Sequence, residues 1–103
     1  MMEAKKPDVY YVVFFETFYD SFDDALAKDP DLIATHLART NEFHSQGTLL
    51  MAGAFLKTPG EALGTMGILT SREAAEEYAK GDPFVLKGMV SKWYIREWAN
   101  IFN

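Results

Sequence analysis

The chain has 103 residues, of which 49% are hydrophobic and 15% aromatic, and its net charge is −5. This length suits one domain with a modest core, and the negative charge argues against nucleic acid or an anionic membrane as a partner. The chain has no Cys, which excludes disulfides and thiolate chemistry, and no apolar run long enough to span a bilayer. We therefore expect one cytoplasmic domain over residues 1–103, of which residues 1–8 form a loose polar leader.

The first predicted strand covers residues 9–15, which are β-branched and aromatic throughout. A run without alternation is typical of a strand covered on both faces, and therefore central in its sheet. Residues 16–28 have no clear pattern, and we expect an irregular segment with at most a helical turn over residues 23–27.

A long helix is predicted over residues 30–46. Asp29 is the expected capping acid, and Pro30 at the first helical position loses no donor that the helix needs. Gly47 supplies the C-terminal stop. The predicted apolar face recurs at helical spacing and consists of Ile33, Leu37, Thr40 and Phe43.

Two strands and a second helix follow. The strands are expected over residues 48–56 and 65–69, joined by a hairpin loop over 57–64 that contains Pro59 and Gly60. Gly53 weakens a strand interior, which indicates a bulge or the close approach of another group. Thr70 and Glu73 fit a capping box for a helix over 71–80, whose predicted inner face is Ala74, Ala75, Tyr78 and Ala79.

The last part of the chain predicts a short helix over 82–87 and a final strand over 89–98. Asp82 and Pro83 repeat the helix-start chemistry, and Gly88 closes the helix. Strict alternation in the last strand places Trp93 with Ser91 and Ile95 on one face, and it places Val90, Lys92, Tyr94, Arg96 and Trp98 on the other.

The predicted order βαββαβ is the ferredoxin-like α+β arrangement, a four-stranded antiparallel sheet with both helices on one face. The first strand is apolar on both sides, but the helices can cover only one of them. We therefore expect a homodimer in which two sheets pack face to face. The two faces of this strand carry Tyr11, Val13 and Phe15, and Tyr10, Val12 and Phe14.

The candidate chemistry reduces to His36 and Asp82. A carboxylate beside an imidazole fixes its tautomer and stabilises its protonated form, which makes a usable general base or acid near neutral pH. The competing interpretation is that Asp82 only caps a helix and that His36 is a packed residue at an apolar edge. His44 lies near a helix C-terminus, where a cationic ring is favoured, so its expected role is structural. The spacing of eight between the histidines is not that of a metal site, and we expect no metal and no cofactor.

The sequence resembles the YciI-like (YCII-related) family. The matching residues are His36 and Leu37, the run from Gly47 through Leu49, Leu50 and Ala52 to Gly53, and the run from Asp82 through Pro83 and Phe84 to Val85, followed by Gly88. The resemblance implies the dimeric α+β barrel fold and a pocket centred on a His–Asp pair, here His36 and Asp82. Similar folds carry isomerase, dehydrochlorinase and cofactor-free monooxygenase activities on small cyclic or aromatic compounds. Members often carry Arg three residues before the His, where this chain has Ile33, while Arg39 lies three residues after it.

Two functions remain open at this point. In the first, a small-molecule enzyme uses His36 as general acid or base with Asp82 orienting it, and performs an isomerisation or elimination. In the second, a non-catalytic dimer binds a small molecule or another protein. In the first case Gly53 lets a ligand approach the strand backbone, and the pocket wall is expected to be Met51, Phe84 and Tyr10 or Tyr11.

Overall fold

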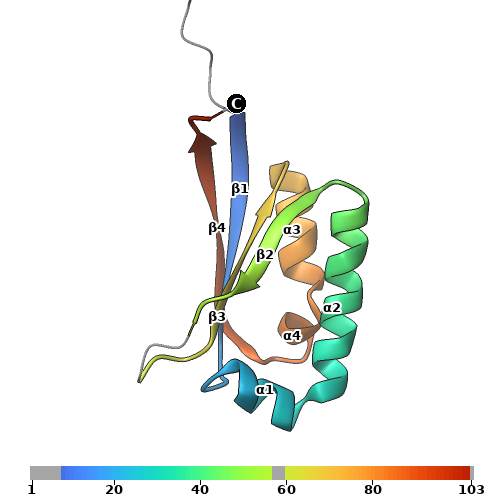
Figure 1. Cartoon of the computed structure of the whole chain (residues 1–103), viewed down its shortest axis with the longest axis vertical. Helices are drawn as coiled ribbons and strands as arrows, with labels where there is room; N and C mark the ends of the chain where they lie inside the picture. The colour runs from blue at the N-terminus through green and yellow to red at the C-terminus, as the bar shows by residue number, and fades with distance from the viewer. Residues whose placement is uncertain (1–7, 57–59, 103) are drawn as a thin grey trace, which may run out of the picture.

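The computed structural model describes residues 8–56 and 60–102 (Figure 1). The predicted leader, apart from Asp8, and Pro59 of the predicted loop lie outside the described residues. In chain order the elements are β1 (Asp8–Thr17), α1 (Phe22–Lys28), α2 (Pro30–Ser45), β2 (Leu49–Ala54), β3 (Gly64–Leu69), α3 (Arg72–Gly81), α4 (Pro83–Leu86) and β4 (Val90–Asn100).

The strands form one antiparallel sheet in the order β2-β3-β1-β4, so the first strand is central as predicted, with the third strand beside it. All four helices lie on the same side of this sheet (Figure 1). The α+β ferredoxin-like arrangement predicted from the sequence is therefore confirmed. Among the described residues, no helix is both long and apolar enough to cross a membrane.

The main core lies between the sheet and α3. Val13 and Phe15 of β1 are 0% and 4% exposed and point toward the helices. The predicted inner face of α3 is confirmed, since all four of its residues are buried. Its alanines let the helix backbone approach the sheet, while Tyr78 stacks on Phe15 and meets the edge of Phe43 at centroid distances of 6.0 and 5.4 Å.

The helix ends follow the predicted chemistry with two corrections. Gly47 and Gly88, with φ of 80° and 75°, close α2 and α4 as expected, because this left-handed conformation is strained for other residues. The cap of α3 is Ser71 and not Thr70: the Ser71 Oγ accepts a hydrogen bond from the Ala74 amide at 3.1 Å. Asp29 makes no side-chain cap on α2, because its carboxylate accepts a hydrogen bond from Tyr19 instead.

Residues 22–28 form a full helix, α1, where the sequence predicted an irregular segment. Ser21 caps it, with its Oγ accepting from the Asp24 amide at 3.0 Å, while the Asp24 carboxylate accepts from the Asp20 amide at 2.9 Å. Ser21 thus caps the first turn as in a capping box, while Asp24 holds the amide of the residue before the cap. The sequence signal for this helix start is Ser21 followed three residues later by Asp24.

Three side-chain placements differ from the sequence predictions. Leu37, expected on the buried face of α2, is 50% exposed. Val90 packs against the core on the helix side, because a register shift between Glu16 and Thr17 of β1 breaks the strict alternation of β4. The bulge of β2 lies between Leu49 and Met51 and not at Gly53, where an added Cβ would meet nothing within 4 Å.

The other side of the sheet carries no helix. Tyr10 and Phe14 of β1 face Trp98 and Tyr94 of β4, at ring-centroid distances of 6.4 and 5.0 Å. Below, "open face" means this side of the sheet, made by Tyr10, Val12, Phe14, Met51, Met66, Ile68, Tyr94, Arg96 and Trp98.

Candidate active site

Asp82 lies at the junction between α3 and α4. Its backbone is extended, with φ −62° and ψ 133°, and Pro83 starts the next helix. The Asp82 Oδ2 accepts a hydrogen bond from the Phe84 amide at 3.0 Å, which confirms the predicted cap. Its side chain is 1% exposed, so the carboxylate needs a second polar partner to compensate for burial.

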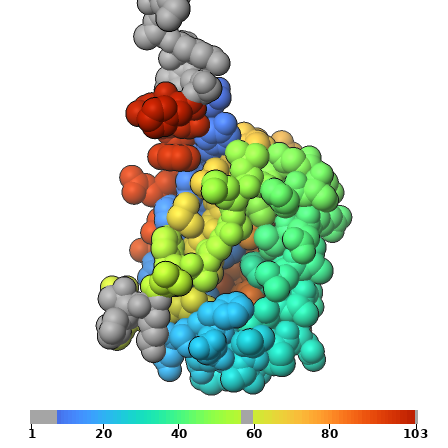
Figure 2. Space-filling view, in the orientation of Figure 1, coloured from blue at the N-terminus to red at the C-terminus, as the bar shows by residue number. Residues whose placement is uncertain are grey.

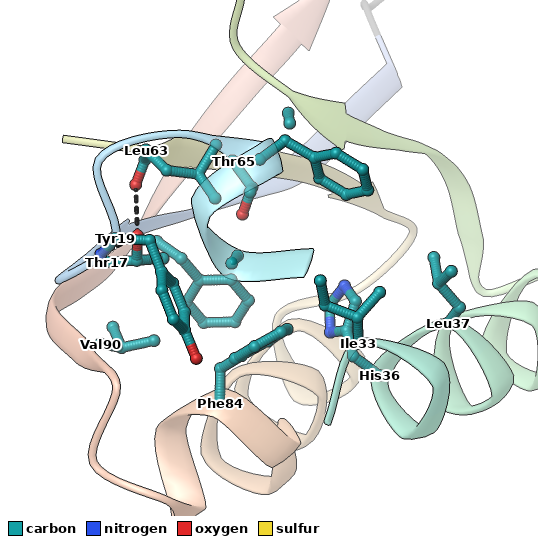
Figure 3. Close-up of a pocket in the computed structure, with 13 residues that line it drawn as sticks. Thr17, Tyr19, Ile33, His36, Leu37, Leu63, Thr65, Phe84 and Val90 are labelled. Carbon is teal, nitrogen blue, oxygen red and sulfur yellow. Dashed lines mark hydrogen bonds between the residues drawn. The ribbon is translucent and has the colours of Figure 1, made fainter. Parts of the chain in front are cut away.

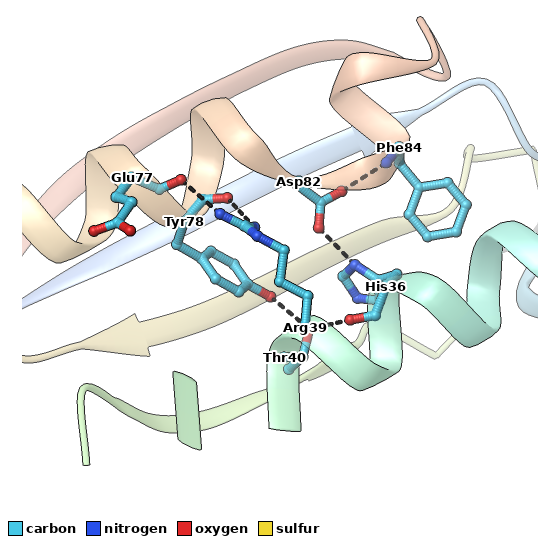
Figure 4. A network of polar contacts seen from close by, with 7 residues as sticks. All are labelled: His36, Arg39, Thr40, Glu77, Tyr78, Asp82 and Phe84. Carbon is cyan, nitrogen blue, oxygen red and sulfur yellow. Dashed lines mark hydrogen bonds and ion pairs between the residues drawn. The ribbon is translucent and has the colours of Figure 1, made fainter. Parts of the chain in front are cut away.

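That partner is His36. Its Nδ1 lies 2.6 Å from Asp82 Oδ1 (Figure 4), so the contact that the sequence left open is made. An ionised carboxylate can only accept, so Nδ1 donates, and the neutral ring then carries its lone pair on Nε2. Within the part of the chain that the structure describes, Nε2 has no hydrogen-bond partner and is open to solvent. The pair therefore presents a fixed, accessible acceptor.

His36 lies at the edge of an apolar hollow. The surface is recessed between β2, α1 and α2 (Figure 2), and the cavity volume is about 80 Å³. The side chains around it come from β1, α1, α2, α4 and the ends of β2, β3 and β4 (Figure 3). They are almost entirely apolar toward the cavity: Phe15, Thr17, Tyr19, Phe22, Ala25, Ile33, His36, Leu37, Ala54, Leu63, Thr65, Phe84 and Val90.

Phe84 connects the pair to this hollow. Its ring centroid lies 5.2 Å from that of His36 and 5.8 Å from that of Tyr19, edge to face with the latter. Because the Phe84 amide also donates to Asp82, one residue fixes both the carboxylate and the wall of the cavity. Phe84, expected in the pocket wall, is among the side chains that line this hollow.

Tyr19 lines the hollow with its ring but turns its hydroxyl away. The hydroxyl donates to Asp29 Oδ2 at 2.5 Å, and the residue is 1% exposed. Burial raises the pKa of Tyr19 well above its ordinary value, and the hydrogen bond to Asp29 and the charge of that carboxylate raise it further. This hydroxyl therefore stays protonated and is not available as an acid in the cavity.

The other predicted wall residues do not line this cavity. Met51 and Gly53 border a separate shallow hollow over β2 and β3, because alternation along β2 turns them to the open face. Tyr10 lies beside Trp98 on that same face. Tyr11 points to the helix side, where the Arg72 guanidinium covers its ring at 5.3 Å.

Two further side chains considered for the site, Arg39 and His44, bind backbone carbonyls outside the cavity. Arg39 donates to the backbone carbonyls of Glu77 and Tyr78, so it does not replace the family's missing Arg inside the cavity. His44 Nδ1 lies 2.8 Å from the Leu49 carbonyl and must donate to it, which ties α2 to β2. This agrees with the structural role expected for His44.

Most of the cavity wall was missed from the sequence. Ile33 and Leu37 were recognisable in principle, since they lie one turn before His36 and directly after it on the same helix. Thr17 and Tyr19 had no signal, because residues 16–28 show no clear periodicity in the sequence. Among residues 8–56 and 60–102, no group of three or more His, Asp or Glu side chains is arranged to hold a metal ion.

Comparison with known proteins identifies the family of this chain. Residues 11–99 match the YCII-related domain. Protein YciI of Escherichia coli O6:H1 is 28% identical over 100 residues, covering 89% of this chain and 98% of YciI. The family match therefore covers most of the chain.

Solved structures show the same fold at low sequence identity. The 5-chloro-2-hydroxyhydroquinone dehydrochlorinase TftG from Burkholderia phenoliruptrix AC1100, in complex with 2,5-dihydroxybenzoquinone, is 17% identical with a TM-score of 0.63 over 86% of this chain and 92% of TftG. PA3566 from Pseudomonas aeruginosa is 10% identical with a TM-score of 0.51 over 96% and 98%. The chain thus belongs to the YCII-related family, and it shares the ferredoxin-like α+β fold of TftG and PA3566.

Proposed function

We propose that this protein is a small-molecule enzyme in which His36 performs general acid–base chemistry and Asp82 orients it. One observation carries the proposal: a buried carboxylate holds Nδ1 at 2.6 Å and leaves Nε2 open beside an apolar cavity. A positioned imidazole is the commonest biological proton acceptor, and such groups contribute about 10²–10⁴-fold to a rate.

The reaction that fits is a proton transfer. Nε2 takes a proton from the substrate, and the negative charge of Asp82 stabilises the imidazolium that forms. The proton then returns to a different atom of the substrate, which is an isomerisation, or a leaving group departs with its electron pair, which is an elimination. Neither route changes the oxidation state of the protein or needs a second reactant.

The substrate class follows from the cavity wall. The rings of Phe15, Tyr19 and Phe84 favour a flat, ring-shaped compound with few charges. About 80 Å³ holds only a few water molecules, so a ring would also contact Phe22 and Leu37 at the mouth, which are 48% and 50% exposed. The hydroxylated quinone bound by TftG, which has the same fold, supports this class.

We also infer that two copies pair through the open face. Aromatic and aliphatic side chains cover this face without any helix over them; Met51 is 69% exposed and Trp98 48%. Contiguous apolar patches of this kind are uncommon on monomers and mark interaction sites. A second copy of the same sheet is the complementary apolar surface that the chain itself supplies.

The enzyme proposal is tested by turnover on a panel of lactones and hydroxylated or chlorinated aromatic rings. The parent should convert at least one compound, His36→Ala should abolish the conversion, and Asp82→Asn should reduce it strongly. The matched control is His44→Ala, which removes the other histidine of the same helix and should keep the activity per folded molecule. Equal turnover by the parent and His36→Ala on a converted compound would show that the pair is not catalytic.

A second candidate is a non-catalytic binding module, and the small cavity together with the capping role of Asp82 favours it. In that case a ring compound binds, measured by calorimetry, and is recovered unchanged. The affinity would then depend on Phe84 and Leu37 and not on His36. Binding that is lost in Phe84→Ala but kept in His36→Ala, without turnover, would favour the module over the enzyme.

A further inference from the structure

Arg39 lies one turn after His36 on α2 and reaches across to the end of α3 (Figure 4). Its Nη1 donates to the Tyr78 carbonyl and its Nη2 to the Glu77 carbonyl, both at 2.9 Å. These carbonyls belong to the last two turns of α3, where a helix begins to run out of internal donors. The guanidinium fork therefore ties the end of α3 to α2 at two points.

The space around Arg39 shows how closely this contact is fitted. A Cβ built on Gly81 would lie 2.5 Å from Nη2 and 3.2 Å from Cζ, so the guanidinium lies against the backbone of the residue directly before Asp82. Its Cζ also lies 4.8 Å from the centroid of the Phe43 ring and 5.8 Å from that of Tyr78. Hydrogen bonds, ring faces and a bare backbone thus hold it from several sides.

We propose that Arg39 is a positioning residue for the His36–Asp82 pair. His36 and Arg39 are three residues apart and share a face of α2, while Asp82 directly follows the segment that Arg39 holds. A planar fork with two parallel hydrogen bonds fixes direction as well as distance. The clamp thereby brings Asp82 Oδ1 to His36 Nδ1. Its value for catalysis rests on the proposed function, whereas its effect on the ring does not.

A merely stabilising Arg39 makes a different prediction. Its loss would lower the stability of the fold but leave the ring of His36 unchanged in the molecules that remain folded. A positioning Arg39 instead controls which ring nitrogen holds the proton, because the Nδ1–H form depends on the carboxylate being in place. The tautomer of His36 is thus a readout that a structural role alone does not move.

The experiment is ¹⁵N NMR of ring-labelled histidine at a pH where the ring is neutral. The parent should hold the proton mainly on Nδ1. In Arg39→Gln the ratio of Nδ1–H to Nε2–H should fall by about twofold or more, and Arg39→Lys should lie between the two, because one ammonium cannot reproduce the fork. The matched control is Arg72→Gln at the other end of α3, which should leave the ratio at the parent value.

Gly81→Ala approaches the same clamp from the opposite side. The added methyl group displaces Nη2, so the variant should shift the tautomer in the same direction as Arg39→Gln, and the double variant should shift it no further. Arg39→Lys and Gly81→Ala carry the test if Arg39→Gln does not fold, as judged from amide spectra. An unchanged ratio in these folded variants overturns the inference, as does a parent ring protonated on Nε2. Absence of turnover in the parent would instead count only against the proposed function.

Discussion

The two carboxylate oxygens of Asp82 bind two different partners. The contributions of these two contacts to stability can be separated by comparing Asp82→Ala with Asp82→Asn. Oδ2 caps α4 through the Phe84 amide, and Oδ1 holds His36 Nδ1. Alanine removes both contacts. Loss of a cap costs about 0.5–2 kcal/mol, and leaving a half-buried donor without a partner costs about 1–3 kcal/mol. The free energy of unfolding should therefore fall by about 1.5–5 kcal/mol in Asp82→Ala.

Asparagine should cost much less. Its amide oxygen still accepts from the Phe84 amide, and Asn caps a helix about as well as Asp. Its amide NH₂ then faces His36 Nδ1, so a neutral hydrogen bond replaces a charge-assisted one. The expected loss is about 1–1.5 kcal/mol, taken as the difference between the two kinds of bond.

The assay is equilibrium unfolding in urea at neutral pH, with extrapolation to zero denaturant at a common slope. Asp20→Asn and Asp20→Ala, in the exposed turn before α1, are the controls and should change stability by less than about 0.5 kcal/mol. If Asp82→Asn and Asp82→Ala are equally destabilising, the division of labour between the two oxygens is refuted. An alanine effect below about 1 kcal/mol would show that neither contact contributes to stability as described.

Three further predictions concern the fold and its open face. Burial is the largest cause of the raised pKa of both Tyr19 and Tyr78. The unfolded chain therefore loses these two protons at a lower pH than the folded protein does. The free energy of unfolding should fall as pH rises above about 10, by up to about 1.4 kcal/mol per pH unit for each tyrosine. Urea unfolding from pH 9 upward checks this, and a flat profile would contradict it. Leu69→Ala at a fully buried site should cost about 2–5 kcal/mol in the same assay, against less than about 0.5 kcal/mol for exposed Leu86→Ala, and equal losses would contradict the core described here. Light scattering at micromolar concentration should give a dimer for the parent and Leu86→Glu but a monomer for Ile68→Glu, and a monomeric parent would refute pairing through the open face.

The sequence was sufficient for the architecture because each element carried a local signal that agreed with the fold. The apolar run of β1 indicated a central strand, and the small residues of α3 marked the face that packs on the sheet. Asp82 and Pro83 marked the start of α4. The resemblance to YciI-like proteins added the pairing of His36 with Asp82, which spacing alone could not supply.

The remaining errors have physical causes that lie outside local pattern. Val90 lies on the helix side of the sheet and not on the predicted side, because the pairing with β1 shifts register there, and strict alternation cannot detect such a shift. Leu37 is exposed although helical spacing placed it inward, because the recess beside α1 leaves it at the cavity mouth. Tyr19 is held in the cavity wall by a tertiary hydrogen bond to Asp29, and a contact of this kind leaves no local pattern in the sequence. Met51 and Tyr10 lie on the open face, because the side to which a strand residue points depends on the register with its neighbours.

The central claim is that Asp82 holds the proton of His36 on Nδ1 so that Nε2 can meet a ring-shaped substrate. It is tested most directly by ¹⁵N NMR of the histidine ring nitrogens in the unmodified protein, recorded with and without a small phenol such as hydroquinone. The account predicts a proton on Nδ1, and a phenol-dependent shift of the His36 Nε2 resonance while His44 stays unchanged. A His36 ring that carries its proton on Nε2, or an Nε2 resonance that no phenol moves, would contradict it.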